Sequence, residues 1–414
     1  MTEPQMPPGP GAGPLSGFRV IDLTVNMTGP MATMILGDQG ADVVKVEPPQ
    51  GDVIRRLGCG RAGTTAYFAN LNRSKRSIVV DVRQPDGRDL VRRLAAGADV
   101  FIENFRPGVI ERLGLGPEEL RAAHPALVYV SITGYGRTGP LTATPVYDHV
   151  VQALSGIAAR QADRSGVPAL VRQGIVDKAT GYSVSQAVTA ALLARTRTGI
   201  GARVEVSMLD VALHFLWPDG MMNHTCLDPV NELPPIANTF RLTETADGFV
   251  ALITVTDDQW QGLMRASGRA DLLEDPRFRT SADRMRNGGT GMRMIAPILA
   301  EMPTGEVVAR LTEHDVPCAA VTDLDDVRTH PQVIASGSLE ESVDPRLGRV
   351  VQPRPTARFA EMPQAARRPS PGLGEHTDEI LGELGLTPDA VAELRQQGVV
   401  GGGETAFDRG DPAG

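Results

Sequence analysis

The sequence is poor in cysteine and in aromatic residues, and it lacks any long apolar run. Its three cysteines lie far apart in a chain of 414 residues, at Cys59, Cys226 and Cys318. This number and spacing exclude a disulfide scaffold and a CxxC zinc site, and they indicate a reducing compartment. No apolar run reaches the roughly 18 residues that a transmembrane helix needs, and the N-terminus lacks the pattern of a signal peptide. We therefore expect a cytoplasmic protein with no membrane partner.

Several common catalytic and nucleotide-binding motifs are also missing. No GxGxxG sequence follows the first predicted strand, and no Walker lysine motif, GxSxG elbow or HExxH motif occurs. The seven histidines show no metal-ligand spacing, so we expect no metal site. The formal net charge of −9 disfavours nucleic acid as a partner. With 41% hydrophobic and 22% charged residues, the composition is that of a globular protein, and we expect an enzyme.

Short strand-like runs alternate with helical stretches in the first half of the chain. Strands are predicted at Phe18–Leu23, Asp42–Val46, Ser77–Val82, Asp99–Glu103 and Leu127–Ile132, and the strongest helix at Thr180–Arg197. This alternation predicts an α/β fold with a parallel sheet. Later strand-like runs and helices indicate a smaller α+β domain. We expect disordered tails at 1–14 and 401–414, a large domain over 15–220, a small domain with its linker over 221–320, and a segment over 321–400 that returns to the large domain.

Basic residues gather in two places in this acidic chain. One group runs from Arg55 to Arg61 and continues in the stretch Asn72–Arg76, directly ahead of a predicted strand. The other, from Asn104 to Arg112, follows the Asp99–Glu103 strand. Ligands of parallel sheets bind beyond the carboxyl ends of the strands, and arginine and lysine there suit a polyphosphate. The alternative is that these cations form a solvated face.

One aspartate, Asp177, lies just ahead of the strongest predicted helix. As the N-cap of that helix, its carboxylate would accept hydrogen bonds from backbone N–H groups. The helix dipole would also keep the carboxylate ionised, and so able to act as a nucleophile. The residues alone leave both roles open.

Taken in order, a set of segments resembles the class III CoA-transferases of the CaiB–BaiF type, the superfamily of formyl-CoA transferase and α-methylacyl-CoA racemase. The resemblance runs from about Leu15 to Val400. Its segments are LSGFRVIDLT (15–24), GPMATMILGDQGADVVKVEPPQGD (29–52), NLNRSKRSIVVDV (70–82), DVFIENFRPGVIERLGL (99–115), SITGYGRTGP (131–140), YDHVVQALSG (147–156) and GARVEVSMLD (201–210).

The resemblance implies a fold, an assembly and a reaction. The fold is a Rossmann-like large domain built from both ends of the chain plus a smaller domain, and two ring-like protomers interlink as a homodimer. In the reaction, Asp177 attacks an acyl-CoA donor to give a mixed anhydride and then an aspartyl-CoA thioester, and a carboxylic acid acceptor takes over the CoA. CoA and acyl-CoA are substrates, and no permanently bound cofactor is implied.

The resemblance also implies the residues around the substrate. CoA would contact Thr28, Leu71, Asn72, Arg73, Ser74, Lys75, Asn104, Phe105 and Arg112. The side chains of Met27, Tyr147 and Asp148 would line the active site. Some formyl-CoA transferases have glutamine at the position of Met27, so an acceptor acid larger or more apolar than oxalate is favoured. The glycine-rich loop that covers the intermediate in some transferases has no glycine in the corresponding stretch, 231–239.

Two alternatives remain at this stage. The first is an acyl-CoA racemase of the α-methylacyl-CoA type, whose His–Asp pair corresponds here to Tyr147 and Asp148, with His149 offset from the histidine position. Tyrosine has a pKa near ~10, which makes it a poor base for removing a proton next to a thioester. The second alternative is a CoA-binding protein with little turnover. The donor acyl-CoA and the acceptor acid are not identified by the sequence.

Overall fold

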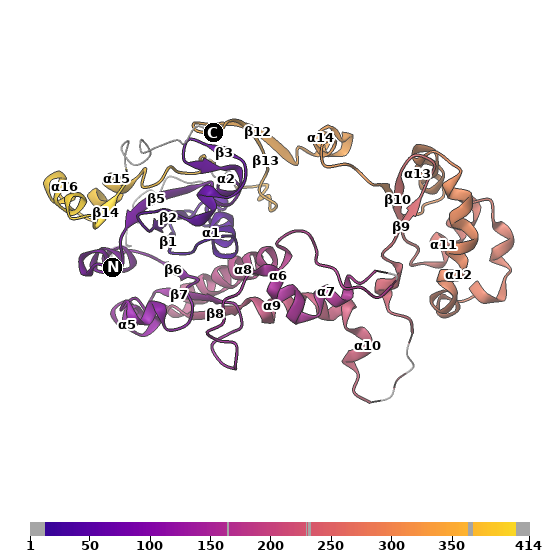
Figure 1. The fold of residues 1–414 in the computed structure, drawn as a ribbon, viewed down its shortest axis with the longest axis horizontal. Coiled ribbons are helices and arrows are strands. Elements are labelled where there is room, and N and C mark those ends of the chain that lie inside the picture. The colour runs from indigo at the N-terminus through magenta and orange to yellow at the C-terminus, as the bar shows by residue number, and fades with distance from the viewer. Residues whose placement is uncertain (1–12, 164, 229, 231–232, 363–366, 403–414) are drawn as a thin grey trace. The chain divides into compact units, whose positions relative to one another are not determined.

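The structure is a computed structural model that describes residues 13–163, 165–228, 230, 233–362 and 367–402. The chain divides into two compact units (Figure 1). The first unit takes in residues 1–215 and 338–414, and the second takes in Leu216–Gly337. Most of each expected tail lies outside the described residues. Gly401 is an exception, because it belongs to a strand of the first unit and not to a tail.

The first unit is built on a seven-stranded sheet with the order β14-β5-β2-β1-β6-β7-β8. The predicted parallel sheet is confirmed, since every neighbouring pair from β5 to β8 is parallel. Only β14, at the edge, runs antiparallel to its neighbour β5. The strands are β1 (Arg19–Asp22), β2 (Asp42–Glu47), β5 (Lys75–Val80), β6 (Val100–Glu103), β7 (Val128–Thr133), β8 (Arg203–Ser207) and β14 (Val400–Gly401).

Side chains that alternate along the strands build a core on each face of this sheet. Ile21 points into one core together with residues of α3 (Pro85–Ala96), α5 (Pro117–Ala123), α15 (Thr377–Glu383) and α16 (Pro388–Gln396). Its neighbour Val20 points into the other, with residues of α1 (Thr28–Asp38) and α8 (Ile175–Thr198). The C-terminal helices and β14 therefore complete a unit that the N-terminal strands begin.

The second unit has an antiparallel sheet of the order β11-β10-β9 and its own core. The strands are β9 (Leu242–Glu244), β10 (Phe249–Leu252) and β11 (Cys318–Ala320), and the main helices are α11 (Asp257–Ala266), α12 (Ser281–Ala300) and α13 (Thr304–Glu313). Capping boxes at Thr256 and Thr280 start α11 and α12. Among the described helices of both units, none is long and apolar enough to cross a membrane.

Candidate active site

Two helices on the same face of the sheet bring the main site residues together. Helix α1 begins at Thr28, six residues after the buried end of β1, and α8 begins at Ile175. A glycine, Gly181, lies between them, where a Cβ atom would stand only 3.1 Å from the carbonyl oxygen of Thr28 and the Cβ of Met31. The missing side chain lets the two helices approach closely, and Thr28 thereby meets the first turn of α8.

Asp177 lies inside that first turn and is not the N-cap, which is Gly174. The N-cap interpretation of the sequence is therefore wrong. The Asp177 side chain is buried, and its Oδ1 accepts a hydrogen bond from the Thr28 hydroxyl. Within the described part of the chain, Oδ2 has no hydrogen-bond partner. One carboxylate oxygen is thus held in place, while the other has no partner among the described residues.

Burial dominates the electrostatics of Asp177. The pKa of the carboxyl is raised from 3.8 to about 6, mainly by burial and to a smaller extent by the charge of Asp148, against the opposing effects of Thr28 and His149. The pKa of Asp177 is therefore set mainly by desolvation. At neutral pH the carboxylate is still mostly ionised, and it is more basic than an exposed aspartate.

Asp148 holds the backbone from which Asp177 projects. It is the first residue of α6 (Asp148–Ser155), and its Oδ2 accepts a hydrogen bond of 2.8 Å from the backbone N–H of Asp177. Its Oδ1 accepts one of 2.5 Å from Gln152. The Gln152 amide in turn bonds both the N–H and the carbonyl of Val171 and the carbonyl of Gln173, just before α8. Asp148 is therefore a positioning residue for Asp177.

A charge-neutral change at Asp148 tests this role. In Asp148→Asn, the negative charge that raises the pKa of Asp177 disappears, so that pKa falls. If the ionised Asp177 is the reacting group, the acidic limb of kcat moves to lower pH, and kcat on the plateau drops about tenfold or more as the carboxylate loses its alignment. The pH profile of CoA transfer checks this result. Asp86→Asn, an exposed change in the first turn of α3, is the control, and an unmoved acidic limb in Asp148→Asn would contradict the assignment.

Tyr147 and Met27 stand at the edges of this group. Tyr147 is the N-cap residue of α6 and is 61% exposed, with its ring stacked on His149 at 6.5 Å between centroids. Met27 is the N-cap residue of α1, and its Sδ would lie 2.9 Å from a Cβ at Gly174. Met27 thus lies beside the entry to α8, one turn before Asp177.

The carboxyl ends of β1 and β6 meet beside the same helices. The side chain of Asn104 clamps the loop after β1, since it donates to the carbonyl of Val25 at 2.9 Å and accepts from its N–H at 3.0 Å. Phe105 follows, with its N–H bonded to the Glu103 carboxylate at 2.9 Å. Arg112 is the last residue of α4 (Val109–Arg112) and is exposed. Its guanidinium donates no hydrogen bond to the described residues. This edge therefore offers a free cation.

Comparison with known proteins places the chain in a family. The sequence model of CoA-transferase family III matches residues 15–377. The chain belongs to CoA-transferase family III. It is 32% identical over 403 residues to succinyl-CoA:glutarate CoA-transferase of Mus musculus, with 95% of this chain and 91% of that protein covered. The chain is thus a class III CoA-transferase, as its sequence segments indicated.

Two further family members support the assignment. The chain is 36% identical to the probable fatty acyl-CoA transferase Rv3272 of Mycobacterium tuberculosis, over 91% of this chain and 99% of that one. The crystal structure of Rv3272 matches with a TM-score of 0.79 at 34% identity, over 89% and 99% of the two chains. A CaiB/BaiF family protein from Brucella suis matches with a TM-score of 0.76 at 31% identity, over 90% and 100%.

The basic stretch at residues 71–75 is placed differently from the expectation. It leads into the amino end of β5, because Lys75 pairs in register with Val43 near the start of β2. It therefore does not extend beyond the carboxyl ends of the parallel strands. Leu71 is buried in an apolar cluster with Met31 and Phe68. Contact of this stretch with CoA in this CoA-transferase stays a prediction.

The charged side chains of that stretch are internal. Arg73 is buried and forms an ion pair of 2.6 Å with Asp38, which also accepts a hydrogen bond from Ser74. Lys75 is fully buried, where it contacts Asp22 at 3.0 Å and Asn72 at 2.9 Å. Arg73 and Lys75 are therefore not unpaired cations that could hold a polyphosphate as they stand. They do not form a solvated face either, because both are buried.

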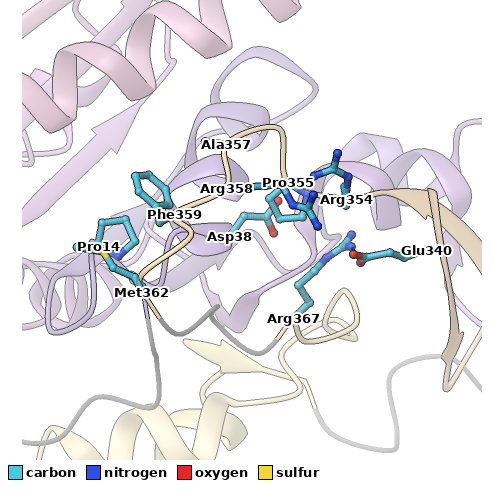
Figure 2. A pocket seen from close by; sticks show the side chains of 11 residues that line it. Pro14, Asp38, Glu340, Arg354, Pro355, Ala357, Arg358, Phe359, Met362 and Arg367 are labelled. Atoms are coloured by element: carbon cyan, nitrogen blue, oxygen red, sulfur yellow. The ribbon is translucent and has the colours of Figure 1, made fainter. Parts of the chain in front are cut away.

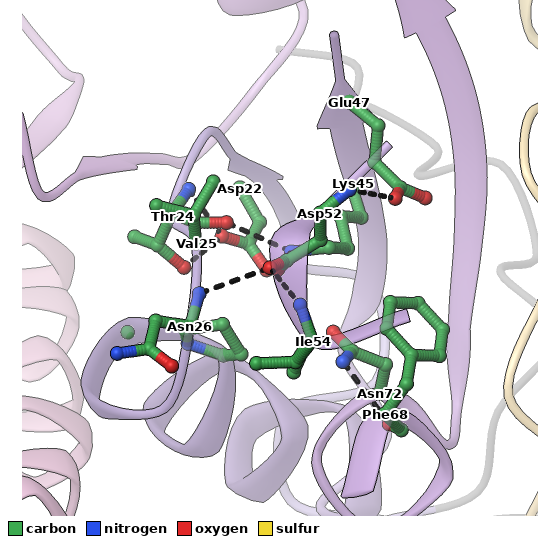
Figure 3. Close-up of polar contacts among 12 residues, drawn as sticks. Asp22, Thr24, Val25, Asn26, Lys45, Glu47, Asp52, Ile54, Phe68 and Asn72 are labelled. Carbon is green, nitrogen blue, oxygen red and sulfur yellow. Dashed lines mark hydrogen bonds and ion pairs between the residues drawn. The ribbon is translucent and has the colours of Figure 1, made fainter. Parts of the chain in front are cut away.

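A buried ionic network that contains Asp22, Lys45 and Asp52 lies beside the loop after β1 (Figure 3). Lys45 forms an ion pair of 3.0 Å with Asp52 and donates to the carbonyl of Thr24 at 2.8 Å. Asp52 accepts hydrogen bonds from the backbone N–H groups of Asn26 and Ile54. The network thus fixes the loop that carries the chain from β1 into Thr28 and α1.

One residue near the site has no counterpart in the sequence-based prediction. Tyr67, in α2 (Ala66–Asn72), is half-buried. Burial first, and then the charges of Asp177, Asp52 and Asp148, raise its pKa to about 12. The phenol therefore stays protonated near three carboxylates. The chain has only five tyrosines, and Tyr67 lies just before the Leu71–Lys75 stretch. This position in the sequence could have indicated that Tyr67 lies near the site.

Two further expectations concern metals and a covering loop. Among the described residues, no group of three or more histidine, cysteine or acidic side chains is arranged to hold a metal ion. The stretch 231–239, which would correspond to a glycine-rich loop, begins with two residues that lie outside the described part of the chain.

Proposed function

We propose that Asp177 is the nucleophile by which this CoA-transferase moves CoA from an acyl-CoA donor to a carboxylic acid acceptor. The observation that carries the proposal is the state of its carboxylate: buried, held at Oδ1 by Thr28, without a partner at Oδ2 among the described residues, and with a pKa of about 6. A partly desolvated carboxylate that remains ionised at neutral pH is a stronger nucleophile than an exposed one.

The reaction conserves the energy of the thioester in four steps. Oδ2 of Asp177 attacks the donor carbonyl, the C–S bond breaks, and CoA leaves as a thiolate from the mixed anhydride. The thiolate attacks the aspartyl carbonyl and releases the donor acid, which leaves an aspartyl-CoA thioester. The acceptor carboxylate then displaces CoA to form a second anhydride, and the thiolate attacks the acceptor carbonyl. Acceptor-CoA forms, the Asp177 carboxylate is regenerated, and no bond is hydrolysed, so the cycle requires no ATP.

The site and the relatives support a proposal for the substrates. We expect CoA to lie along Thr28, Asn104 and Phe105, with Arg112 near a phosphate. Met27 gives the acid site an apolar element next to Gly174, which favours an acceptor larger or more apolar than oxalate. The name of the mouse relative includes glutarate, an acid of this kind. We also propose an interlinked homodimer, as the family resemblance implies, and the cytoplasmic location stays a prediction.

Exchange chemistry separates transfer from racemisation. With a 2-methylacyl-CoA and a free acid, we expect a new CoA thioester of the acid and no deuterium at the α-carbon in D₂O. The reason is that Tyr147, at the position of the racemase base, is a poor proton acceptor and is largely exposed. Chromatography of the thioesters and NMR of the α-position measure the two outcomes. Deuterium incorporation without added acid would identify a racemase, and neither reaction across a broad acid panel would favour a CoA-binding protein of low turnover.

A further inference from the structure

The first unit contains a cavity of about 290 Å³ away from Asp177. We call it the arginine pocket, because its lining includes Arg354, Arg358 and Arg367. Asp38, the last residue of α1, also lines it. Thr28 stands at the other end of α1, about 15 Å away for a helix of this length. The pocket is therefore separate from the candidate active site, although the same helix reaches both.

The two acidic side chains of the arginine pocket are already neutralised. Asp38 accepts hydrogen bonds from Arg73 at 2.6 and 3.1 Å and from Ser74. The carboxylate of Glu340, in β12 (Leu339–Asp344), is paired with Arg367. Arg354 and Arg358 have no carboxylate partner among the described residues. The pocket therefore keeps an excess of positive charge.

Arg354 is the decisive residue. Its Nε and Nη1 atoms are buried from solvent and have no hydrogen-bond partner among the described residues. A guanidinium is charged at every physiological pH, and burying charged donors without an acceptor is unfavourable. Nη1 of Arg55 and Nε of Arg121 are also buried without a partner among the described residues, but neither residue lines the arginine pocket. Arg354, in contrast, lines the arginine pocket, which can hold an acceptor.

The opposite side of the pocket is apolar. Figure 2 shows Pro14, Phe359 and Met362 on one side and Arg354 and Arg367 on the other. A volume of about 290 Å³ lies near the lower end of the range of small-molecule sites. An apolar wall facing arginines fits a small molecule with an anionic head and an apolar body. We propose that the arginine pocket binds a small organic anion, with a phosphate or carboxylate head group on Arg354 and Arg358.

Calorimetric titration with phenyl phosphate and with benzoate tests the proposal and separates the two head groups. The full-length protein is first saturated with CoA, so that the CoA site is occupied. We expect one of the probes to bind, and Arg354→Gln and Arg358→Gln to weaken its binding about ten- to a hundredfold, as the loss of a charge-assisted hydrogen bond does. Arg349→Gln is the matched control, since Arg349 lies on the neighbouring strand β13 (Gly348–Pro353) with its side chain 82% exposed.

Each outcome decides the proposal. Tighter binding of phenyl phosphate assigns a phosphate head group, and tighter binding of benzoate assigns a carboxylate. If neither probe binds the wild-type protein at millimolar concentration, or if Arg349→Gln weakens binding as much as the pocket variants, the proposal is overturned. Because Arg358 is exposed and without a partner among the described residues, Arg358→Gln keeps the test decisive if Arg354→Gln does not fold. CoA affinity measured in the same variants should stay at the wild-type level.

Discussion

Asp177→Asn is expected to abolish CoA transfer and, at the same time, to make the protein more stable. An amide cannot form the anhydride, so turnover should fall by roughly 10³-fold or more, as the loss of a covalent nucleophile does. Asparagine keeps an oxygen that can accept the hydrogen bond of Thr28, and it keeps the backbone bond to Asp148. The fold therefore loses little, while the chemistry loses its reacting group.

The gain in stability comes from the buried charge. The pKa of Asp177 is raised from 3.8 to about 6 in the folded protein. A carboxyl with a raised pKa contributes stability below pH 3.8, and this contribution is lost as the pH rises through about 6. The difference between the two values corresponds to about 3 kcal/mol at pH 8. Asp177→Asn removes this cost, so it should unfold at higher urea concentration than the wild type at pH 8, and the advantage should vanish towards pH 4.

Three measurements check the two halves of this prediction. Thioester exchange gives the turnover, urea unfolding at pH 4 and pH 8 gives the stability, and mass spectrometry with acyl-CoA detects a covalent adduct that only the wild type should form. Asp86→Asn serves as the control for a change of charge on an exposed helix. If Asp177→Asn retains substantial turnover, the nucleophile is another residue. If it is less stable than the wild type at pH 8, the carboxylate has a structural role.

Five of the seven strands of the sheet could be predicted from the sequence to within a few residues, because each contains a short apolar run. The Asp99–Glu103 prediction, for example, differs from β6 only at its first residue. Two strands were missed for physical reasons. β14 has only two residues, too few for any pattern to be visible. In β8, the burial alternates at the edge of the sheet, so it lacks the continuous apolar run of the central strands.

The start of α8 shows a different limit of sequence patterns. The apolar spacing predicts a helix from Thr180, but the structure begins it at Ile175, five residues earlier. Acidic residues are favoured both at an N-cap and in the first helical turn, so the position of Asp177 could not be decided from its residue type. Packing against α1 decides it, through the close approach at Gly181. The role proposed for Asp177 depends on that contact with Thr28.

The ion pairs of the basic stretch could not be predicted because the partners of a charge can be distant in sequence. Arg76 forms ion pairs with Glu379 and Glu383, which are 303 and 307 residues away. Lys75 meets Asp22 across 53 residues. A local run of cations looks the same in the sequence whether it faces a phosphate or internal carboxylates. Only the arrangement of the strands distinguishes the two, and here it directs Arg112 outward and Lys75 inward.

Lys75 and Arg112 should therefore respond to neutralisation in opposite ways. Burial alone would raise the pKa of Asp22, but the charges of Lys75 and Lys45 outweigh it and lower that pKa to about 2. Lys75→Met leaves the Asp22 carboxylate buried without one of its two lysine partners. We expect this change to lower the free energy of unfolding by about 3–5 kcal/mol. The double variant Asp22→Asn with Lys75→Met should recover most of the loss, since no unpaired charge remains at Asp22. Urea unfolding of the wild type, the two single variants Asp22→Asn and Lys75→Met, and the double variant measures the coupling.

Arg112→Gln is the matched comparison in the same assays. Because Arg112 is exposed and unpartnered within the described residues, its replacement should change the unfolding free energy by less than about 0.5 kcal/mol. If Arg112 meets a phosphate of CoA, CoA should bind about ten- to a hundredfold more weakly to Arg112→Gln, as calorimetry would measure. The Lys75 variants should instead bind CoA normally under conditions where they are folded. If Lys75→Met is stable but binds CoA more weakly, Lys75 contacts the ligand. The basic stretch would then bind CoA, as its sequence suggested.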